Sequence, residues 1–164
     1  MEYRATYPSP LGTLTLTGDG RALTGLWLDG RAPEARDDGR TVTDGRVPGI
    51  AEALLWLDGY FAKAAPSPST VPLRLAGTPF QEAVWRHLLT VPYGTTTTYG
   101  AVARSLVAKG TRASAVAVGQ AVGANPAAIL VPCHRVCGAD GSLTGYAGGL
   151  DAKAWLLAHE GVSL

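Results

Sequence analysis

The chain has 164 residues, of which 46% are apolar and 16% are charged, and its formal net charge is +1. That length suits one domain or two small lobes, and the composition is typical of a globular rather than a disordered protein. No apolar run approaches the roughly 20 residues that a membrane-spanning helix needs. The N-terminus lacks the basic start and apolar middle of a secretory signal. We therefore expect a cytoplasmic protein with no membrane partner.

Cys133 and Cys137 are the two cysteines of the chain, and they restrict its metal and redox chemistry. Two cysteines cannot complete a cysteine-rich zinc site, and the three histidines show no metal-type spacing with them. A disulfide between the two would be unusual in a reducing compartment. We expect neither a metal nor another cofactor.

Acidic residues are unevenly distributed along the chain. Residues 1–76 hold eight Lys or Arg against nine Asp or Glu, whereas residues 77–164 hold six against four. No acidic residue occurs between Glu82 and Asp140. A long acid-free segment with several basic residues is typical of a surface that faces a polyanion. An Ala- and Gly-rich core would show the same pattern, so charge alone leaves both interpretations open.

The N-terminal part alternates short β-type runs with turn signals. Runs at 3–7, 12–18 and 22–28 are separated by Pro-Ser-Pro and Gly-Asp-Gly, which predicts a meander of three strands. Residues 31–49 are polar and without a period, so we expect an exposed loop there.

A helix and a linker are predicted next. The run 50–63 places Leu54, Leu57 and Phe61 on one helical stripe, which predicts that these residues face the core. Residues 64–72 are rich in Pro and Ser and break this pattern, so we expect them to form a linker.

Thr78, Pro79 and Gln81 carry the signals of a helix start. Threonine is a favoured N-cap, proline suits the first helical position, and a glutamine three residues after the cap completes a capping box. The predicted buried face of this helix consists of Phe80, Val84 and Leu88, with Trp85 beside them.

Residues 99–108 and 112–123 predict two short helices joined by Lys-Gly-Thr, which is the arrangement of a helix-turn-helix. Such modules usually read bases with long polar side chains on the second helix. Here that helix is mostly Ala, Val and Gly, which favours binding through phosphates over sequence reading, although tight packing in a core would also suit it. The residues expected to contact DNA are Arg104, Arg112, Val116, Ala117 and Gln120.

The remaining chain predicts a buried strand or extended segment, a loop and a last helix. Residues 125–133 contain the apolar run that leads to Cys133, and residues 138–150 form a glycine-dense loop. Residues 150–161 predict the helix, with Gly161 as its C-cap.

Taken together, these elements predict an α+β fold in two domains. Residues 1–76 would form a small N-terminal domain of a β-meander plus a helix, ending in the linker. Residues 77–164 would form a mainly α C-terminal domain that contains the helix-turn-helix and the reactive cysteine.

Cys133 follows an apolar run and precedes His134, which permits several interpretations. Free cysteine is among the most buried residue types, so Cys133 could simply fill the core. A neighbouring histidine that is oriented by a carboxylate can also take the thiol proton and make the sulfur a nucleophile. Glu160, at the end of the last helix, is the candidate carboxylate, because the other acids of the second half suit caps and surface positions.

Five segments resemble one family closely: GTPFQEAVW, VPYGTTTTYGAVA, AVGQAVGANP, ILVPCHRV and GSLTGYAGGLDAKAWLLAHEG. They are similar to the O6-alkylguanine-DNA alkyltransferases, the single-use DNA repair proteins. The resemblance runs from about Gly77 to Gly161, and the Pro-Cys-His-Arg block with its flanks is highly specific. Residues 1–76 match weakly but look like that family's N-terminal, ribonuclease-H-like domain.

The resemblance implies a role for each residue that matches the family's motifs. Cys133 would accept the alkyl group as a stable thioether, and His134, through a bridging water to Glu160, would hold the sulfur as a thiolate. Asn125 would order its turn and support the cysteine segment. Tyr99 would help to rotate the target phosphate and donate a proton to the departing guanine.

The resemblance also implies a pocket for the flipped base. Tyr146 and the backbone of Ala147 and Gly148 would line it. Carbonyl groups near Cys133 and Val136 would accept hydrogen bonds from the base. Arg135 belongs to the same block, and we expect it to serve as an ion-pair partner rather than a catalyst.

Two positions depart from the family pattern. Val116 stands where the family usually has an arginine that fills the gap left by the extruded base, and Arg112 could substitute for it. An apolar wedge can also fill such a gap, but it offers the orphaned partner base no hydrogen bond. Ala147 stands where a serine is common, which removes one possible contact to the alkylated oxygen.

The sequence therefore predicts a methylated-DNA–protein-cysteine methyltransferase that flips O6-alkylguanine, and also O4-alkylthymine, out of duplex DNA and alkylates its own Cys133 once. Its expected partner is double-stranded DNA that contains the lesion, and the protein is expected to be a monomer. The main alternative is a non-catalytic sensor that binds alkylated bases. A helix-turn-helix regulator with a structural cysteine and a cysteine hydrolase also stay open.

Overall fold

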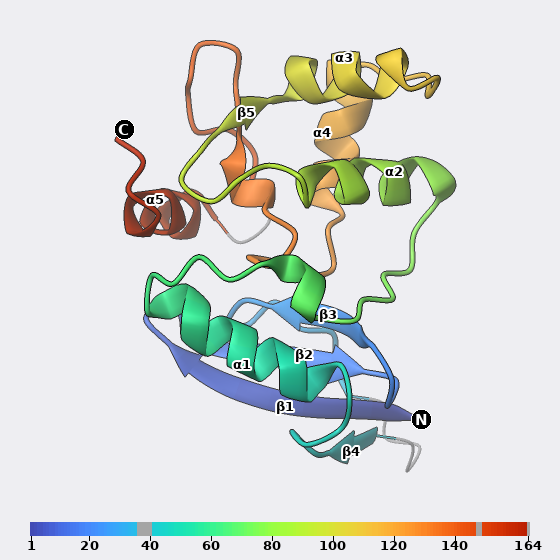
Figure 1. Cartoon of the computed structure of the whole chain (residues 1–164), viewed down its shortest axis with the longest axis vertical. Helices are drawn as coiled ribbons and strands as arrows, with labels where there is room; N and C mark the ends of the chain where they lie inside the picture. The colour runs from blue at the N-terminus through green and yellow to red at the C-terminus, as the bar shows by residue number, and fades with distance from the viewer. Residues whose placement is uncertain (36–40, 147–148, 164) are drawn as a thin grey trace. The chain divides into compact units, whose positions relative to one another are not determined.

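The computed structural model describes residues 1–35, 41–146 and 149–163 (Figure 1). The α+β fold class predicted from the sequence is confirmed, with strands gathered in the N-terminal part and helices in the C-terminal part. None of the helices in these described ranges is long and apolar enough to cross a membrane.

The chain forms two compact units. The first comprises Met1–Ala76 and takes in the short segment Pro126–Ala128, and the second comprises Gly77–Asn125 and Ile129–Leu164. The chain therefore passes from the second unit into the first at Pro126–Ala128 and is again part of the second unit from Ile129, shortly before Cys133.

The first unit contains a four-stranded sheet in the order β3-β2-β1-β4. Its strands are β1 (Glu2–Ser9), β2 (Gly12–Gly18), β3 (Leu23–Trp27) and β4 (Thr41–Thr43). Strand β2 is antiparallel to both β1 and β3, and β4 is parallel to β1. The predicted meander is confirmed. The fourth strand was expected to be loop, because three residues are too few to show a period of two and the strand forms only through its pairing with β1.

Helix α1 (Ile50–Phe61) lies across one face of this sheet, as Figure 1 shows. The predicted buried stripe was partly wrong, since Leu54 and Phe61 are only half-buried. The buried face consists of Ile50, Ala53, Trp56, Leu57 and Tyr60. Gly49 precedes the helix with a φ of +89°, and a Cβ there would come within 2.3 Å of the Ala22 carbonyl carbon, so the close approach of these two segments requires glycine.

Two short segments pair with the free side of β3 in the first unit. The predicted linker contains a 3-10 turn, η1 (Pro68–Thr70), and then bonds to Leu23 through the Pro72 carbonyl at 2.8 Å. Farther along β3, the Leu26 amide donates to the Pro126 carbonyl and the Leu26 carbonyl accepts from the Ala128 amide, both at 2.9 Å. The edge of β3 thus holds the chain just ahead of the cysteine segment.

The second unit is mainly helical, with α2, α3 and α4 packed against one another and α5 farther along the chain. Its helices are α2 (Pro79–Leu88), α3 (Tyr99–Ala108), α4 (Ala115–Gly123) and α5 (Leu150–His159). The capping box predicted for α2 is present: Thr78 Oγ1 accepts from the Gln81 amide at 3.1 Å, and Gln81 Oε1 accepts from the Thr78 amide at 3.0 Å. Phe80 is half-buried, and the buried face is Val84, Trp85 and Leu88.

The helix-turn-helix consists of α3 and α4, which begin at hydroxyl N-caps. Thr98 Oγ1 accepts from the Ala101 amide and Ser114 Oγ accepts from the Ala117 amide, each at 3.1 Å. The second helix was expected from residue 112, but it starts three residues later because Ser114 is the N-cap. Arg112 therefore precedes α4 and does not lie on its first turn.

The apolar run before Cys133 is buried, but residues 128–130 form a turn rather than the strand or extended segment that the sequence predicted. Ile129 adopts a φ of +70°, in the left-handed region that a β-branched residue rarely enters, and Pro126 and Pro132 lack amide donors for a ladder. The chain then forms a 3-10 turn, η2 (Cys133–Arg135), and a short strand, β6 (Val136–Cys137). Strand β6 pairs in parallel with β5 (Thr97–Thr98), a strand that the sequence analysis did not predict.

Candidate active site

Cys133 lies at the start of η2 and is 2% exposed. Its Sγ accepts a hydrogen bond from Asn125 Nδ2 at 2.7 Å, and the thiol donates to the Val122 carbonyl at 3.4 Å. Asn125 Nδ2 also donates to the Val131 carbonyl at 2.9 Å, so one amide joins the end of α4 to the cysteine segment. Both cysteines of the chain are free thiols.

Burial raises the pKa of the Cys133 thiol to about 12, although the Asn125 hydrogen bond and the positive charge of Lys153 act in the opposite direction. At neutral pH the resting group is therefore the thiol, whereas the sequence analysis expected a standing thiolate. The desolvation of a buried anion outweighs the two favourable contacts. A reaction at this sulfur needs a proton acceptor close by.

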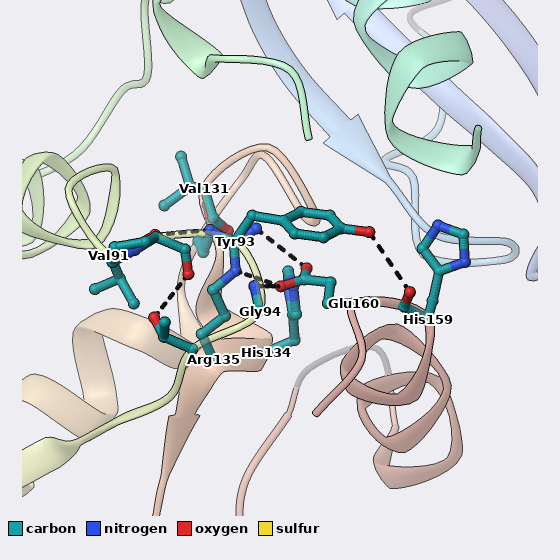
Figure 2. A network of polar contacts seen from close by, with 11 residues as sticks. Val91, Tyr93, Gly94, Val131, His134, Arg135, His159 and Glu160 are labelled. Carbon is teal, nitrogen blue, oxygen red and sulfur yellow. Dashed lines mark hydrogen bonds and ion pairs between the residues drawn. The ribbon is translucent and has the colours of Figure 1, made fainter. Parts of the chain in front are cut away.

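His134 and Glu160 form a buried pair beside the cysteine, with 2.6 Å between His134 Nε2 and Glu160 Oε2 (Figure 2). The two side chains are in direct contact, whereas the sequence analysis expected a water to bridge them. Burial lowers the pKa of His134 despite the adjacent carboxylate, so the imidazole is neutral at pH 7. Because Nε2 faces the carboxylate, Nε2 carries the hydrogen and Nδ1 presents a lone pair. Within the described ranges, His134 Nδ1 is buried and has no hydrogen-bond partner.

Glu160 is the C-cap of α5 and accepts hydrogen bonds from three residues in two segments, His134 and Arg135 of η2 and Gly94 (Figure 2). Arg135 Nε donates to Oε1 at 2.8 Å and Arg135 Nη2 to Oε2 at 3.1 Å, while the Gly94 amide donates to Oε1 at 3.0 Å. Burial alone would raise the pKa of Glu160, but the hydrogen bonds from His134 and Arg135 outweigh it and hold the pKa well below its ordinary value. The carboxylate is therefore ionised and can orient the imidazole.

Arg135 links Glu160 to the segment that contains Val91 and Tyr93. Its Nη1 donates to the Val91 carbonyl at 2.8 Å, and its guanidinium carbon lies 5.7 Å from the centroid of the Tyr93 ring. Figure 2 shows the guanidinium and the His134 ring meeting the same carboxylate. Arg135 thus forms an ion pair with Glu160. A direct contact of Arg135 with a substrate stays a prediction.

Lys153 is a buried residue of this site that the sequence analysis missed. Its side chain is fully buried on α5, and Nζ donates to the Val136 carbonyl and, at 2.9 Å, to the Thr144 carbonyl. Its charge favours the Cys133 thiolate. The signal was available in the sequence, because Lys153 lies one turn before Leu156 and Leu157, on the inward-facing side of α5.

Tyr99 and Tyr146 both lie in the second unit near the thiol. The Tyr99 hydroxyl donates to the Thr144 carbonyl at 2.9 Å. Burial raises the pKa of Tyr99, and nearby Cys137 and Cys133 add to the shift. Burial also raises the pKa of Tyr146, whose buried hydroxyl has no partner among the residues that the structure describes. The two tyrosines thus offer hydroxyl groups that hold their protons at neutral pH.

The predicted base contacts are only partly visible. Ala147 and Gly148 lie outside the described residues. The Val136 carbonyl accepts from Lys153 and the Cys133 carbonyl accepts from the Val136 amide, so each would have to accept a second hydrogen bond to contact a base. Oxygen of a carbonyl group has two lone pairs, which leaves this possible.

The residues expected to contact DNA lie on or next to α3 and α4. Arg104, Arg112, Val116 and Gln120 are exposed, and Ala117 is half-buried. Val116 is 74% exposed, which is a large value for an apolar side chain. Among the residues that the structure describes, no cluster of His, Cys, Asp or Glu could hold a metal ion.

Two family models match the chain. The DNA-binding domain of 6-O-methylguanine DNA methyltransferase matches residues 79–162, and the ribonuclease-like domain of the same family matches residues 3–75. A methylated-DNA–protein-cysteine methyltransferase of Mycolicibacterium paratuberculosis is 46% identical over 160 residues, which cover 98% of this chain and 92% of the relative.

Solved structures agree with these matches. The crystal structure of the O6-methylguanine methyltransferase of Mycobacterium tuberculosis is 44% identical, has a TM-score of 0.81, and is matched over 98% of this chain and 93% of its own. A structure of the same organism's OGT in complex with DNA is 45% identical, with a TM-score of 0.79 and coverage of 96% and 92%. The chain therefore belongs to the 6-O-methylguanine DNA methyltransferase family.

Proposed function

We propose that this protein is a methylated-DNA–protein-cysteine methyltransferase that repairs alkylated bases in DNA and alkylates its own Cys133 once. One observation carries the proposal: a buried thiol bonded to Asn125 lies beside an imidazole whose free Nδ1 is backed by an ionised Glu160. The family and its DNA-binding domain support DNA as the partner. Double-stranded DNA that carries O6-alkylguanine, or O4-alkylthymine, is the substrate that we propose.

The reaction balances with the groups present. The sulfur attacks the alkyl carbon on O6, a carbon–sulfur bond forms, and the carbon–oxygen bond breaks. The thiol proton passes to His134 Nδ1 through a bridging water, and the departing guanine receives a proton from the Tyr99 hydroxyl. The imidazolium then releases its proton and the Tyr99 phenolate regains one through solvent, so the net change is alkyl transfer to sulfur and proton transfer from the thiol to the guanine. The product thioether is a poor leaving group, so one chain reacts once and needs no second nucleophile. All the groups belong to one chain, in agreement with a monomer.

Burial of Cys133 gives the resting protein an inert thiol. The pKa of about 12 means that little thiolate is present until a base arrives and the proton can move to the imidazole. Because the sulfur is 2% exposed, the flipped base reaches it only as the surrounding side chains make room. The Tyr146 ring is the candidate wall of that base pocket.

Intact mass after incubation with duplex DNA that contains O6-methylguanine tests the function. We expect each chain to gain one methyl group, located on Cys133, and never more than one. Tight binding of the lesion without a mass gain would favour a non-catalytic sensor. Methanol release over many turnovers would indicate a hydrolase. The same duplex with unmodified guanine is the control.

Replacement of Asn125 should raise the pKa of the thiol and slow the transfer. Its amide donates to Sγ at 2.7 Å and stabilises the anion more than the thiol, and a hydrogen bond to a charged group is worth about 1.5–3 kcal/mol. We expect Asn125→Ala to transfer roughly 10- to 100-fold more slowly at pH 7, with the pH–rate profile moved to higher pH.

A comparison of the thiol pKa in two Asn125 variants separates this effect from a folding defect. Asn125→Asp removes the donor and adds a negative charge, so it should raise the pKa of the thiol further than Asn125→Ala does. Stopped-flow transfer rates across pH, with urea unfolding of each variant, provide the measurement. Equal profiles for the native protein and both variants would show that Asn125 does not act on the sulfur.

Val116 is proposed to act as an apolar wedge on α4. It is 74% exposed and offers a duplex no charge. We expect Val116→Arg to tighten duplex binding severalfold and to raise the repair rate at limiting DNA, because an arginine can bond the orphaned base or a phosphate. Leu55→Arg, at a 72% exposed position on α1, adds the same charge to the other unit and should leave both quantities unchanged. If Val116→Arg changed neither affinity nor rate, the wedge assignment would fail.

A further inference from the structure

A pocket lies in the helical unit between the C-terminal ends of α2 and α3, and Ala83 and Leu106 form part of its lining. It has a volume of about 260 Å³ and its polar lining consists of Arg86, His87, Thr90, Lys109 and Thr111. A water molecule occupies about 30 Å³ of liquid, so the space admits a phosphate-sized anion with several waters. None of the candidate active-site residues lines it.

Two positive charges of this pocket have no counter-charge. No acidic side chain lines the space, and among the described residues neither Arg86 nor Lys109 forms an ion pair. The C-terminal ends of α2 and α3 each contribute roughly half a negative charge, which explains part of the preference for basic residues there. Two full positive charges exceed that contribution, so the pocket stays positive.

The third observation is a buried nitrogen without a partner. Within the described ranges, His87 Nδ1 is buried and makes no hydrogen bond. Buried polar atoms of this kind are rare in folded proteins, and each one calls for a partner that the chain does not supply. Among the described residues, the Thr111 hydroxyl also has no hydrogen-bond partner, so it can donate into the space.

We propose that this pocket binds a phosphate group, with Arg86 and Lys109 as the charged donors and the His87 ring and the Thr111 hydroxyl as additional donors. The group is either a backbone phosphate of DNA or a free phosphate, because both present the same oxygen atoms. Lys109 and Thr111 flank the turn between α3 and α4, which places the pocket next to the helix-turn-helix. The DNA alternative rests on the proposed function, and the free-anion alternative does not depend on it.

Sulfate is the probe for the pocket, because it keeps its charge between pH 5 and 8 and reports only on the protein. Burial and the charge of Lys109 hold the pKa of His87 below its ordinary value. A bound anion stabilises the imidazolium, so saturating sulfate should raise the pKa of His87 by roughly one unit, equivalent to about tenfold tighter binding to the protonated form. Proton NMR of the His87 ring at matched ionic strength measures this shift, with His159, which stacks on Trp155, as the internal control.

Variants assign the shift to the pocket. We expect Lys109→Ala to weaken sulfate binding roughly tenfold, the effect of losing one charge-assisted hydrogen bond. Arg104→Ala removes an equal charge from the same helix outside the pocket, and it should leave sulfate binding unchanged. A saturable shift of His87 that Lys109→Ala weakens and Arg104→Ala does not would support the site.

Salt dependence of duplex binding separates the two phosphate sources. If a DNA phosphate occupies the pocket, Arg86→Ala should lower the slope of log K against log salt by about 0.9. An unchanged slope, together with sulfate binding, assigns the pocket to a free phosphate group. Absence of a saturable His87 shift with sulfate overturns the proposal whatever the slope shows. The methyl transfer to Cys133 is measured separately, so its failure would not be confused with failure of this site.

Discussion

Cys133→Ser should retain duplex binding and lose alkyl transfer, by a factor on the order of 10³ or more, which corresponds to at least about 4 kcal/mol of barrier. The serine hydroxyl is a far weaker acid than a thiol, so the His134–Glu160 pair cannot generate an oxyanion in the same position. The substitution keeps the shape of the buried side chain. The loss would therefore report on the nucleophile itself.

Cys137→Ser is the matched control, because Cys137 is also a buried free thiol and lies four residues away on β6. We expect this variant to gain one methyl group as the native chain does, once its fold has been verified. The measurement is intact mass after incubation with O6-methylguanine duplex, followed by peptide mapping. A methyl group on Cys133→Ser protein would rule out Cys133 as the acceptor.

Glu160→Ala should destabilise the fold by about 3–5 kcal/mol, the range for breaking a buried ion pair by removing one partner. Arg135 would stay buried with only the Val91 carbonyl as an acceptor that the structure shows, and the Gly94 amide would lose its acceptor. Equilibrium urea unfolding measures the change. The control is Glu2→Ala, which breaks the half-exposed pair with Arg4 and should change the free energy of unfolding by about 0–1 kcal/mol.

The Glu160 carboxylate also accounts for part of the loss of fold stability at low pH. The folded-state pKa of Glu160 lies below its unfolded value of about 4.3, so its contribution to stability is present above that pH and is lost as pH falls through the folded-state pKa. Burial lowers the pKa of His134, so its contribution begins to fall below about pH 6.5. We expect Glu160→Gln to remove much of the decline below about pH 4. If the free energy of unfolding of Glu160→Gln declined at low pH as it does in the native protein, other carboxylates would be responsible for that decline.

Local sequence signals correctly predicted the elements whose ends are marked by capping or turn residues. The capping box of Thr78 and Gln81 located the start of α2 to the residue, and Pro- and Gly-rich turns separated β1, β2 and β3 correctly. These signals succeed because they involve neighbours within four residues. The start of α4 was placed three residues early, since Arg112 and Ala113 suit a helix but Ser114 competes as the N-cap.

Elements that exist only through distant pairing were not predicted. Strands β4, β5 and β6 are two or three residues long and form because β1 or each other supply hydrogen bonds. The apolar run before Cys133 has the composition of a strand, yet it has no strand partner beyond the single bridge of Ala127 to Leu26. The period of apolar residues in a segment does not show whether a distant segment is available to pair with it as a strand.

The candidate site also combines features that the sequence shows with features that only the fold shows. The adjacency of Cys133 and His134, the Asn125 before a proline, and the acid at the end of the last helix are all visible in the sequence, and they suffice to suggest the chemistry. Their distances are not visible. Only the fold brings Glu160 to within 2.6 Å of His134, although 26 residues separate them.

The amino-acid sequence by itself determined which chemical groups are available, where most helices and strands begin, and which family the motifs resemble. The tertiary structure decided the charge states: it buried Cys133 so that its thiol is protonated at rest, turned the neutral His134 toward an ionised Glu160, and drew Lys153 into the core behind them. Desolvation and through-space charge depend on where atoms lie in three dimensions rather than on their order along the chain. The reactivity of the sulfur could therefore be read only from the folded molecule.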